Sequence, residues 1–254
     1  FIIVFAFIYS TNLNEWDNIK SILSPNKLIK SNDFLYGSTL GGLFIYDIED
    51  KSFSKEDIPV FCDELIQFDQ ANNDFWFLCR NGILYNTSNL MISHLEVSRA
   101  IDFIIHDQSI FILYKDDDVY GIMKLNFSNN DIVFEDYYQG FTVNYNEEFI
   151  SISIIEEDLF LLTDEGVYLG DMSSDLKFSS SWSFISSLGS PLDFFLNQDS
   201  LVLFFNDYLS IINKIDFSII NTIDIDLGNY IDFSIYNDSL YLLGDEKIIF
   251  LNAS

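Results

Sequence analysis

The chain has 254 residues, of which 49% are hydrophobic and 17% aromatic, so it can bury the core of one large domain and does not have the composition of a disordered protein. Its 40 acidic and 12 basic residues give a net charge of −28. A surface this acidic argues against binding to nucleic-acid phosphates and anionic lipids. The favoured interpretation of the charge is solubility or adaptation to a salty environment, and the alternative is a surface that binds cations or a cationic partner.

The chain begins with the apolar run FIIVFAFIY at residues 1–9, which is too short to span a bilayer. The run suits the apolar region of a secretory signal peptide, and Ser10 and Thr11 suit its polar end. We therefore expect residues 1–11 to be the remnant of a signal peptide. The sequence would then be a fragment of an exported protein of the periplasm or cell surface, with no membrane span in its mature part. The alternative is that this run is an apolar first strand.

Residues 12–254 contain six β-rich units spaced about 41 residues apart. Each unit has an apolar strand, a tight turn, a second apolar strand and a polar stretch. The first apolar strands begin at Phe34, Phe75, Ile110, Leu159, Leu201 and Leu240. A period near 40 with about four strands per unit is typical of a β-propeller. We predict an all-β propeller of about six four-stranded antiparallel blades near residues 27–58, 62–98, 100–138, 147–186, 191–226 and 230–254.

Turn residues mark the hairpins within these units. Gly41 and Gly42 follow the strand that begins at Phe34, and Asn81-Gly82 lies between apolar strands in the second unit. Glycine allows the positive φ that such turns need, so both positions predict hairpins. Each unit should end in a polar outer strand, because the outside edge of a blade meets water.

Two segments depart from the regular pattern. The longest interval, which follows Ile110, predicts an extra loop around residues 139–148 that helps to shape a binding surface. The sixth unit stops after Leu251 without an outer strand. Either the N-terminal segment supplies that strand and closes a six-bladed ring, or the fragment is also cut at its C-terminus. The second interpretation is favoured.

Cysteine and histidine do not form a recognisable site. Cys62 and Cys79 both lie in the second unit and could pair in an exported protein, although two buried free thiols are the preferred interpretation. His94 is expected in an outer strand and His106 in a turn, both as exposed polar residues. Two cysteines and two histidines do not make a zinc constellation.

Acidic residues cluster at four places, which are residues 47–50, 116–118, 147–148 and 156–158. A calcium site needs six to eight oxygens around one point and usually a glycine at the sharp turn, which Asp116–Asp118 lacks. We interpret the clusters as solvated turn residues. We assign no catalytic, cofactor-binding or metal-binding residue.

The run from Tyr36 to Asp47, YGSTLGGLFIYD, resembles the blade motif of two-component-regulator propellers. Weaker copies follow Arg80 and Asp164, whereas the third, fifth and sixth units lack the hairpin glycine. Trp16, placed just after the signal remnant, adds a similarity to the N-terminal propeller of PorZ-type proteins of the type IX secretion system. The resemblance implies an exported bacterial protein whose propeller is non-catalytic and binds partners, glycans or signals.

The interpretation is an exported, non-enzymatic propeller that binds a protein or glycan at one mouth of the ring. One alternative is a propeller hydrolase or lyase acting on extracellular polysaccharide, which needs paired carboxylates at the centre of the ring. A sialidase-like arginine cluster is disfavoured, because Arg80 and Arg99 are the only arginines. Another alternative is an intracellular scaffold of the WD40 kind, although the Trp-Asp and Gly-His pairs of those repeats are missing.

Overall fold

The computed structural model describes the parts of the chain that form strands and their connections. The described residues are 25–31, 33–39, 42–56, 65–71, 74–86, 92–128, 131–139, 141, 147–186, 191–197, 200–214, 216–225, 230–236, 239–244 and 248–252. The predicted signal-peptide remnant at residues 1–11 lies outside them. Cys62 and Trp16 also lie outside them.

The described residues form six antiparallel sheets, five with four strands and one with three. The first two sheets contain β1 (Pro25–Ser31), β2 (Phe34–Thr39), β3 (Gly42–Asp47) and β4 (Ser52–Glu56), and then β5 (Leu65–Ala71), β6 (Asp74–Cys79), β7 (Ile83–Asn86) and β8 (Ile92–His94). The third and fourth contain β9 (Arg99–His106), β10 (Ser109–Asp116), β11 (Val119–Ser128) and β12 (Asp131–Tyr138), and then β13 (Phe149–Ile155), β14 (Asp158–Thr163), β15 (Gly166–Asp171) and β16 (Trp182–Ser186). The last two contain β17 (Asp193–Asn197), β18 (Ser200–Phe204), β19 (Tyr208–Asn213) and β20 (Ile219–Asp224), and then β21 (Tyr230–Tyr236), β22 (Ser239–Gly244) and β23 (Ile248–Asn252).

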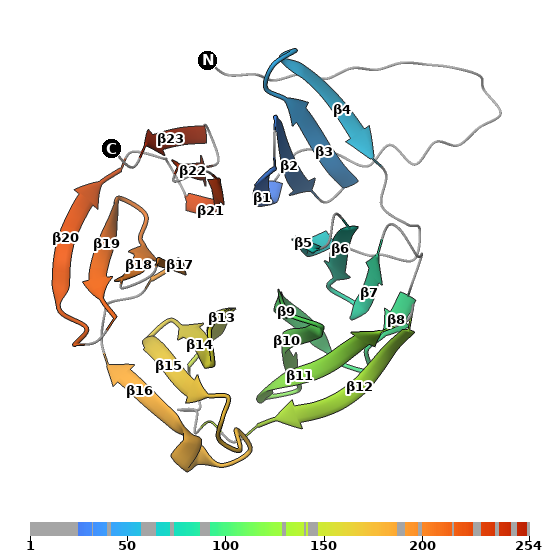
Figure 1. The fold of residues 1–254 in the computed structure, drawn as a ribbon, viewed down its shortest axis with the longest axis vertical. Helices are drawn as coiled ribbons and strands as arrows, with labels where there is room; N and C mark the ends of the chain where they lie inside the picture. Colours follow the sequence, from blue (N-terminus) through green and yellow to red (C-terminus); the bar gives the residue numbers. More distant parts are fainter. Residues whose placement is uncertain are drawn as a thin grey trace. The chain divides into compact units, whose positions relative to one another are not determined.

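The chain divides into two compact units. Unit 1 comprises Phe1–Ile58 and Leu227–Ser254, and unit 2 comprises Pro59–Asp226. Unit 2 holds four consecutive four-stranded sheets, arranged as propeller blades with β5, β9, β13 and β17 on the inside and β8, β12, β16 and β20 on the outside (Figure 1). Unit 1 holds the sheet β1–β4 and the sheet β21–β23. The all-β propeller class is confirmed, and four blades lie together in one unit.

The cores of unit 2 lie between neighbouring blades, because side chains alternate across each strand. In β14, Leu159 and Leu161 pack into a cluster shared with the preceding blade. Phe160 and Leu162, which alternate with them, pack into a cluster shared with the following blade. The same alternation in β10 gives one face to each neighbour. A continuous apolar run therefore predicts a strand buried on both faces, as the blade packing requires.

The hairpin turns use residues with positive φ. Gly82 has a φ of 74° between β6 and β7, which confirms the turn predicted from Asn81-Gly82. Asp107, Asp117 and Glu156 hold φ values of 55°, 51° and 55° in the connections β9–β10, β10–β11 and β13–β14. Short polar side chains tolerate this region better than branched ones, so the aspartates can replace glycine there.

The outer strands are less polar than the sequence analysis expects. Large hydrophobic side chains there are exposed by between 37% and 66%, and they are Phe53 on β4, Val133, Phe134 and Tyr137 on β12, Phe184 on β16, and Ile219, Ile220 and Ile223 on β20. The expectation of polar outer strands holds for β4, which is polar apart from Phe53, whereas β12 and β20 each expose three large hydrophobic side chains. Strand-forming residues are kept at the outer edge although no neighbouring blade covers them.

Helical structure is limited in the described residues to η1 (Ser179–Ser181), a single 3₁₀ turn before β16. Within that same part of the chain, no helix has the length and apolar character needed to cross a membrane.

Candidate functional site

The inner strands carry a polar residue at one equivalent position. In each sheet this residue pairs with the fifth residue of the second strand. We call these the inner polar positions, and they are Lys27, Gln67, Asp102, Ser151, Asp193 and Asp232. In five of the six strands a register shift lies directly before the position. A bulge changes the local direction of a strand, so it can direct a side chain away from the apolar face.

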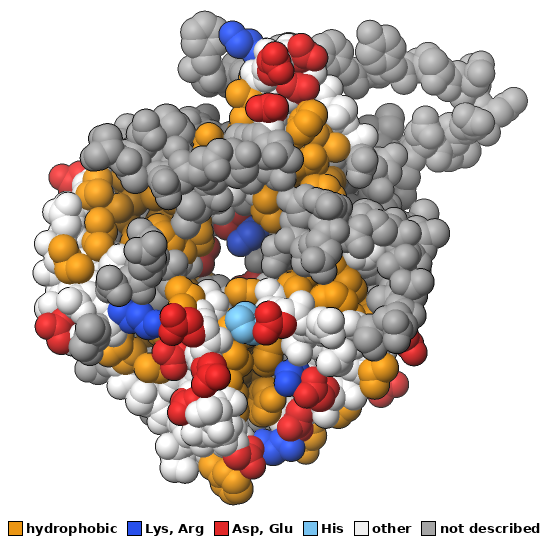
Figure 2. All heavy atoms as spheres, in the orientation of Figure 1, with side chains coloured by type: hydrophobic (Ala, Val, Ile, Leu, Met, Phe, Trp, Pro, Cys, Tyr) orange, Lys and Arg blue, Asp and Glu red, His pale blue; other side chains and the backbone are white. Residues whose placement is uncertain are grey.

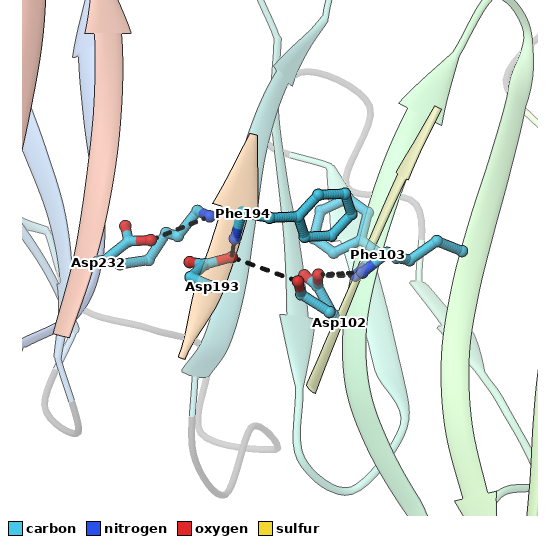
Figure 3. Close-up of polar contacts among 8 residues, drawn as sticks. Asp102, Phe103, Asp193, Phe194 and Asp232 are labelled. Atoms are coloured by element: carbon cyan, nitrogen blue, oxygen red, sulfur yellow. Dashed lines mark hydrogen bonds and ion pairs between the residues drawn. The ribbon is translucent and has the colours of Figure 1, made fainter. Parts of the chain in front are cut away.

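Asp102 ties the inner strands of two blades together. Its Oδ1 accepts a hydrogen bond from the backbone N–H of Phe103 at 2.8 Å, and its Oδ2 accepts one from the backbone N–H of Ile152 at 3.0 Å (Figure 3). Phe103 lies on β9 and Ile152 on β13. Asp102 is 6% exposed, so both bonds form away from bulk water. The buried Asp102 carboxylate therefore links the two blades through two backbone hydrogen bonds.

Asp193 and Ser151 repeat this arrangement at the next junction. Asp193 Oδ1 accepts the backbone N–H of Phe194 at 2.8 Å and the hydroxyl of Ser151 at 3.3 Å. Asp193 begins β17 and Ser151 lies on β13. The residue types differ between these two junctions, but at both of them an inner polar side chain bonds to the neighbouring inner strand.

Unit 1 uses an ion pair at the same position. Lys27 on β1 approaches Asp232 on β21, with Nζ and Oδ1 3.2 Å apart. The Asp232 side chain is 3% exposed, and Lys27 also lies 5.7 Å from the centre of the Phe233 ring. A buried carboxylate requires such a partner, since an unpaired charge would be strongly destabilising.

A second buried carboxylate, Glu147, lies before β13. The interpretation of the acidic cluster at residues 147–148 as solvated turn residues is therefore wrong for Glu147. Glu147 is 3% exposed and accepts hydrogen bonds from the Thr163 hydroxyl at 2.7 Å and the Tyr168 hydroxyl at 2.9 Å. Thr163 in turn accepts the backbone N–H of Gly166 at 3.0 Å. Burial, and then the bond to Glu147, raise the pKa of Tyr168 well above its usual value. In the sequence, the available signal for this buried group was the position of Glu147 directly before the apolar strand β13.

The extra loop predicted at residues 139–148 is held at both of its described ends. Phe141 is 3% exposed and packs 5.1 Å from Phe149 and 5.2 Å from Trp182, measured between ring centres. Glu147 is buried at the other end. These residues anchor the loop to the blade core, and residues 142–146 lie outside the described part.

Two of the predicted acidic clusters act as turn residues. Asp47 Oδ1 accepts the backbone N–H groups of Glu49 and Asp50, both at 2.9 Å. Asp116 accepts a hydrogen bond from the Ser98 hydroxyl, and Asp117 lies in the β10–β11 turn. Their interpretation as turn carboxylates is consistent with these bonds.

A third cluster lines an open pocket on unit 2. Its side chains are Glu156, Glu157, Asp158, Asp171 and Ser173. Asp171 is already engaged, because it accepts hydrogen bonds from the backbone N–H and hydroxyl of Ser173, which lower the pKa of its carboxyl. Among the described residues, no group of three or more histidine, cysteine or acidic side chains is arranged to hold a metal ion.

The histidines and cysteines have separate environments. His94 ends β8, the outer strand of its sheet, as predicted. His106 ends β9 beside the turn, with its Nε2 3.7 Å from Asp107 Oδ2. Cys79 is disulfide-bonded, so the preferred interpretation of free thiols is wrong for this residue. The one other cysteine of the chain, Cys62, lies outside the described residues.

Comparison with known proteins identifies the fold and not a family. No known protein family matches the sequence, and no curated protein matches it. Among solved structures, a protein of unknown function from Bacteroides caccae has a TM-score of 0.65 at 11% identity, with 89% of each chain covered. BamB from Moraxella catarrhalis has a TM-score of 0.57 at 9% identity, covering 89% of this chain and 83% of BamB.

PorZ, an essential bacterial surface component of the type IX secretion system of Porphyromonas gingivalis, has a TM-score of 0.64 at 9% identity. The match covers 92% of this chain but only 37% of PorZ. At these identities the similarity establishes a shared propeller fold, and it transfers no activity.

Proposed function

We propose that the chain is an exported, non-catalytic β-propeller of about six blades that acts as a protein or glycan interaction or sensing module. We place it in type IX secretion or in a regulator-type signalling protein. The propeller arrangement and the similarity to PorZ support this proposal.

The observation that carries the non-catalytic assignment is the engagement of the inner carboxylates. A glycoside hydrolase or lyase of this fold needs two carboxylates that meet the sugar from inner strands. In unit 2, both oxygens of Asp102 accept backbone N–H groups, and Asp193 bonds to Phe194 and Ser151. Proton transfer by Asp102 would break a blade-to-blade bond, so the arrangement serves structure rather than turnover.

Export is supported by the disulfide at Cys79. Disulfides form and persist in oxidising compartments and are rare in the cytosol of mesophiles. The acidic composition and the apolar run at residues 1–9 fit the same proposal. These features favour the periplasm or cell surface over an intracellular scaffold of the WD40 kind.

The compartment is tested by expressing the tagged gene in its own host and separating cytosolic, periplasmic and surface fractions. Thiols are blocked with iodoacetamide before lysis, and the intact mass is measured. We expect a processed chain in an exported fraction with no alkylated cysteine. An unprocessed cytosolic chain carrying two alkyl groups would contradict export.

Catalysis is tested by incubating the purified chain with a panel of extracellular polysaccharides and measuring new reducing ends and unsaturated ends. We expect no release above that of buffer. Release that disappears in Asp193→Asn, while the melting temperature of the variant stays close to that of the wild type, would contradict the non-catalytic assignment.

A further inference from the structure

The outer strand β12 in unit 2 presents an exposed aromatic pair. Phe134 is 54% exposed and Tyr137 is 50% exposed, and their ring centres lie 6.4 Å apart. The pairing of β11 with β12 skips Glu135, because Leu125 pairs with Phe134 and Lys124 with Asp136. This bulge changes the alternation of the strand, so that two residues three positions apart can lie close together.

Charged groups border this aromatic pair. Lys177 Nζ lies 2.6 Å from Asp136 Oδ1 and 5.9 Å from the centre of the Tyr137 ring. Lys124 Nζ lies 2.8 Å from Glu135 Oε1. We call Phe134, Glu135, Asp136, Tyr137 and Lys177 the β12 patch. Figure 2 shows acidic and basic side chains beside hydrophobic ones along the outer part of unit 2.

The β12 patch already holds one ammonium group of the chain. Lys177 is placed between a carboxylate and an aromatic ring, and the Asp136 carboxyl raises its pKa. A cation over an aromatic ring is attracted by the electrons of the ring face, and a nearby carboxylate adds to the attraction. The patch therefore has the chemistry needed to bind a further cation on its exposed rings.

The edge of β12 is arranged against strand addition. The backbone N–H of Tyr137 donates to Asp136 Oδ1 at 2.9 Å, so a side chain of the strand itself occupies this donor. The bulge at Glu135 interrupts the regular spacing of the strand. Both features are known ways to protect an edge from pairing with another chain. A partner must therefore contact side chains rather than extend the sheet.

Charge decides the kind of partner. The chain carries a net charge of −28, so a second copy would be repelled and a basic partner attracted. Locally, Glu135 pairs with Lys124, and Asp136 pairs with Lys177. Burial and the nearby carboxylates of Asp136, Glu135 and Asp175 raise the pKa of Tyr138. Exposed aromatic side chains beside charges are the residues that dominate binding energy at protein interfaces.

We infer that the β12 patch docks a basic segment of a partner protein, one that places lysine or arginine next to aliphatic side chains. The inference rests on the proposed interaction function and specifies its partner. The apolar side chains of the segment cover Phe134 and Tyr137, and its cations lie against the ring faces and carboxylates.

The test measures fluorescence anisotropy of three labelled nonapeptides with the full chain. One alternates arginine and leucine, one alternates glutamate and leucine, and one alternates arginine and serine. We expect the arginine–leucine peptide to bind most tightly and to weaken as salt rises. Two outcomes would overturn the inference at this step: equal binding of the glutamate–leucine peptide, or no binding of the arginine–leucine peptide.

Variants locate the binding surface. The double substitution Phe134→Ser and Tyr137→Ser should weaken the arginine–leucine peptide about tenfold, because hot-spot residues dominate such interfaces. Asp136→Asn, which keeps both rings, should weaken it about threefold through the lost charge. The matched control is Phe53→Ser, which changes an aromatic residue that is 56% exposed on β4 of unit 1. Circular dichroism and melting temperature confirm that each variant folds.

Equal weakening by Phe53→Ser would show that the chain attracts the peptide without a defined patch, and would overturn the inference. Equal binding of the arginine–serine peptide would do the same, since charge alone would then suffice. Neither result bears on the compartment or on polysaccharide turnover. Failure of this inference is therefore distinguishable from failure of the proposed function.

Discussion

At the scale of single residues, the stability of unit 2 depends on a few buried polar groups between blades. Asp102 satisfies two backbone donors that belong to different sheets, and it does so at 6% exposure. Glu147 is similarly buried and accepts hydrogen bonds from two hydroxyl groups. These carboxylates hold apolar sheets in a defined register, which non-directional hydrophobic packing alone does not determine.

We predict that Asp102→Ala destabilises the chain by about 3 kcal/mol, because it leaves two buried N–H groups without acceptors. Asp102→Asn keeps one acceptor and should have an intermediate effect. Urea unfolding followed by tryptophan fluorescence measures both. The control is Asp118→Asn, an exposed turn residue, which should change stability by less than about 0.5 kcal/mol. If Asp102→Ala changed the free energy of unfolding as little as the control does, the two hydrogen bonds of Asp102 would not contribute to stability.

Tyrosine ionisation gives a second prediction. Burial, with Asp136 and Glu135 nearby, raises the pKa of Tyr138 to about 12. Burial and the hydrogen bond to Glu147 likewise raise the pKa of Tyr168. A phenol whose pKa is higher in the folded state contributes stability that is complete below the unfolded value of about 10 and is lost as pH rises toward 12.

Absorbance at 295 nm should therefore show that Tyr138 titrates near pH 12 and that Tyr168 titrates well above its usual range, while stability falls from pH 10 upward. Tyr138→Phe removes one late-titrating group and should reduce this dependence. Titration of every tyrosine near pH 10 in a chain that is still folded would contradict the assignment.

At the scale of elements, the sequence located strands and turns well because each has a local cause. The apolar runs predicted from Phe34, Phe75 and Ile110 lie on β2, β6 and β10, and Asn81-Gly82 identified the turn before β7. The inner polar positions were missed, because their meaning depends on contacts between sheets about 40 residues apart in the chain. In retrospect, aligning the inner strands by their period shows the polar residue in every unit.

Two other features could not be predicted from the sequence for different reasons. The exposed rings of Phe134 and Tyr137 depend on the bulge at Glu135, which is a matter of register between strands. The disulfide bond at Cys79 depends on a contact between separate segments of the chain, which a single sequence does not give. Spacing alone allowed pairing without requiring it.

The β6–β7 hairpin offers a prediction at this scale. Gly82 has a φ of 74°, and a Cβ added there would lie 2.6 Å from the carbonyl oxygen of Leu95. Gly82→Ala should therefore destabilise the chain by about 2 kcal/mol through backbone strain and the forced movement of that carbonyl. Thermal and urea unfolding measure the effect.

The matched variant is Glu156→Gly in the β13–β14 turn, where a non-glycine residue holds a φ of 55°. Glycine adopts this φ without strain but loses more entropy on folding, so stability should change by less than about 1 kcal/mol. If both substitutions destabilised the chain equally, positive φ would not be the cause of the Gly82 effect.

At the scale of the whole molecule, the chain combines apolar blades with a strongly anionic surface. Four of its lysines offset this charge locally, because each contacts a carboxylate and lies within 6 Å of the centre of an aromatic ring; they are Lys27, Lys124, Lys177 and Lys214. With 12 basic residues for 40 acidic ones, most carboxylates have no cation of the chain to pair with. Self-repulsion therefore opposes the folded state and falls as salt screens it.

We predict that the melting temperature rises as sodium chloride is increased from low concentration to about 1 M, where the Debye length falls to about 3 Å. Surface ion pairs such as Lys177–Asp136 weaken under the same conditions, but exposed pairs of this kind contribute little to stability. Repulsion among the unpaired carboxylates is the larger effect, so the net change should be stabilising. Differential scanning calorimetry at a series of salt concentrations measures it.

The same measurement separates screening from specific binding. Calcium chloride matched in ionic strength to sodium chloride should give a similar melting temperature if the acidic clusters at residues 116–118 and 156–158 are solvated turns. A much larger rise with calcium, saturating at low concentration, would show that one of them is a cation site. A melting temperature that falls with sodium chloride would mean that ion pairs outweigh repulsion, and self-repulsion would then not be the main effect of the acidic surface on stability.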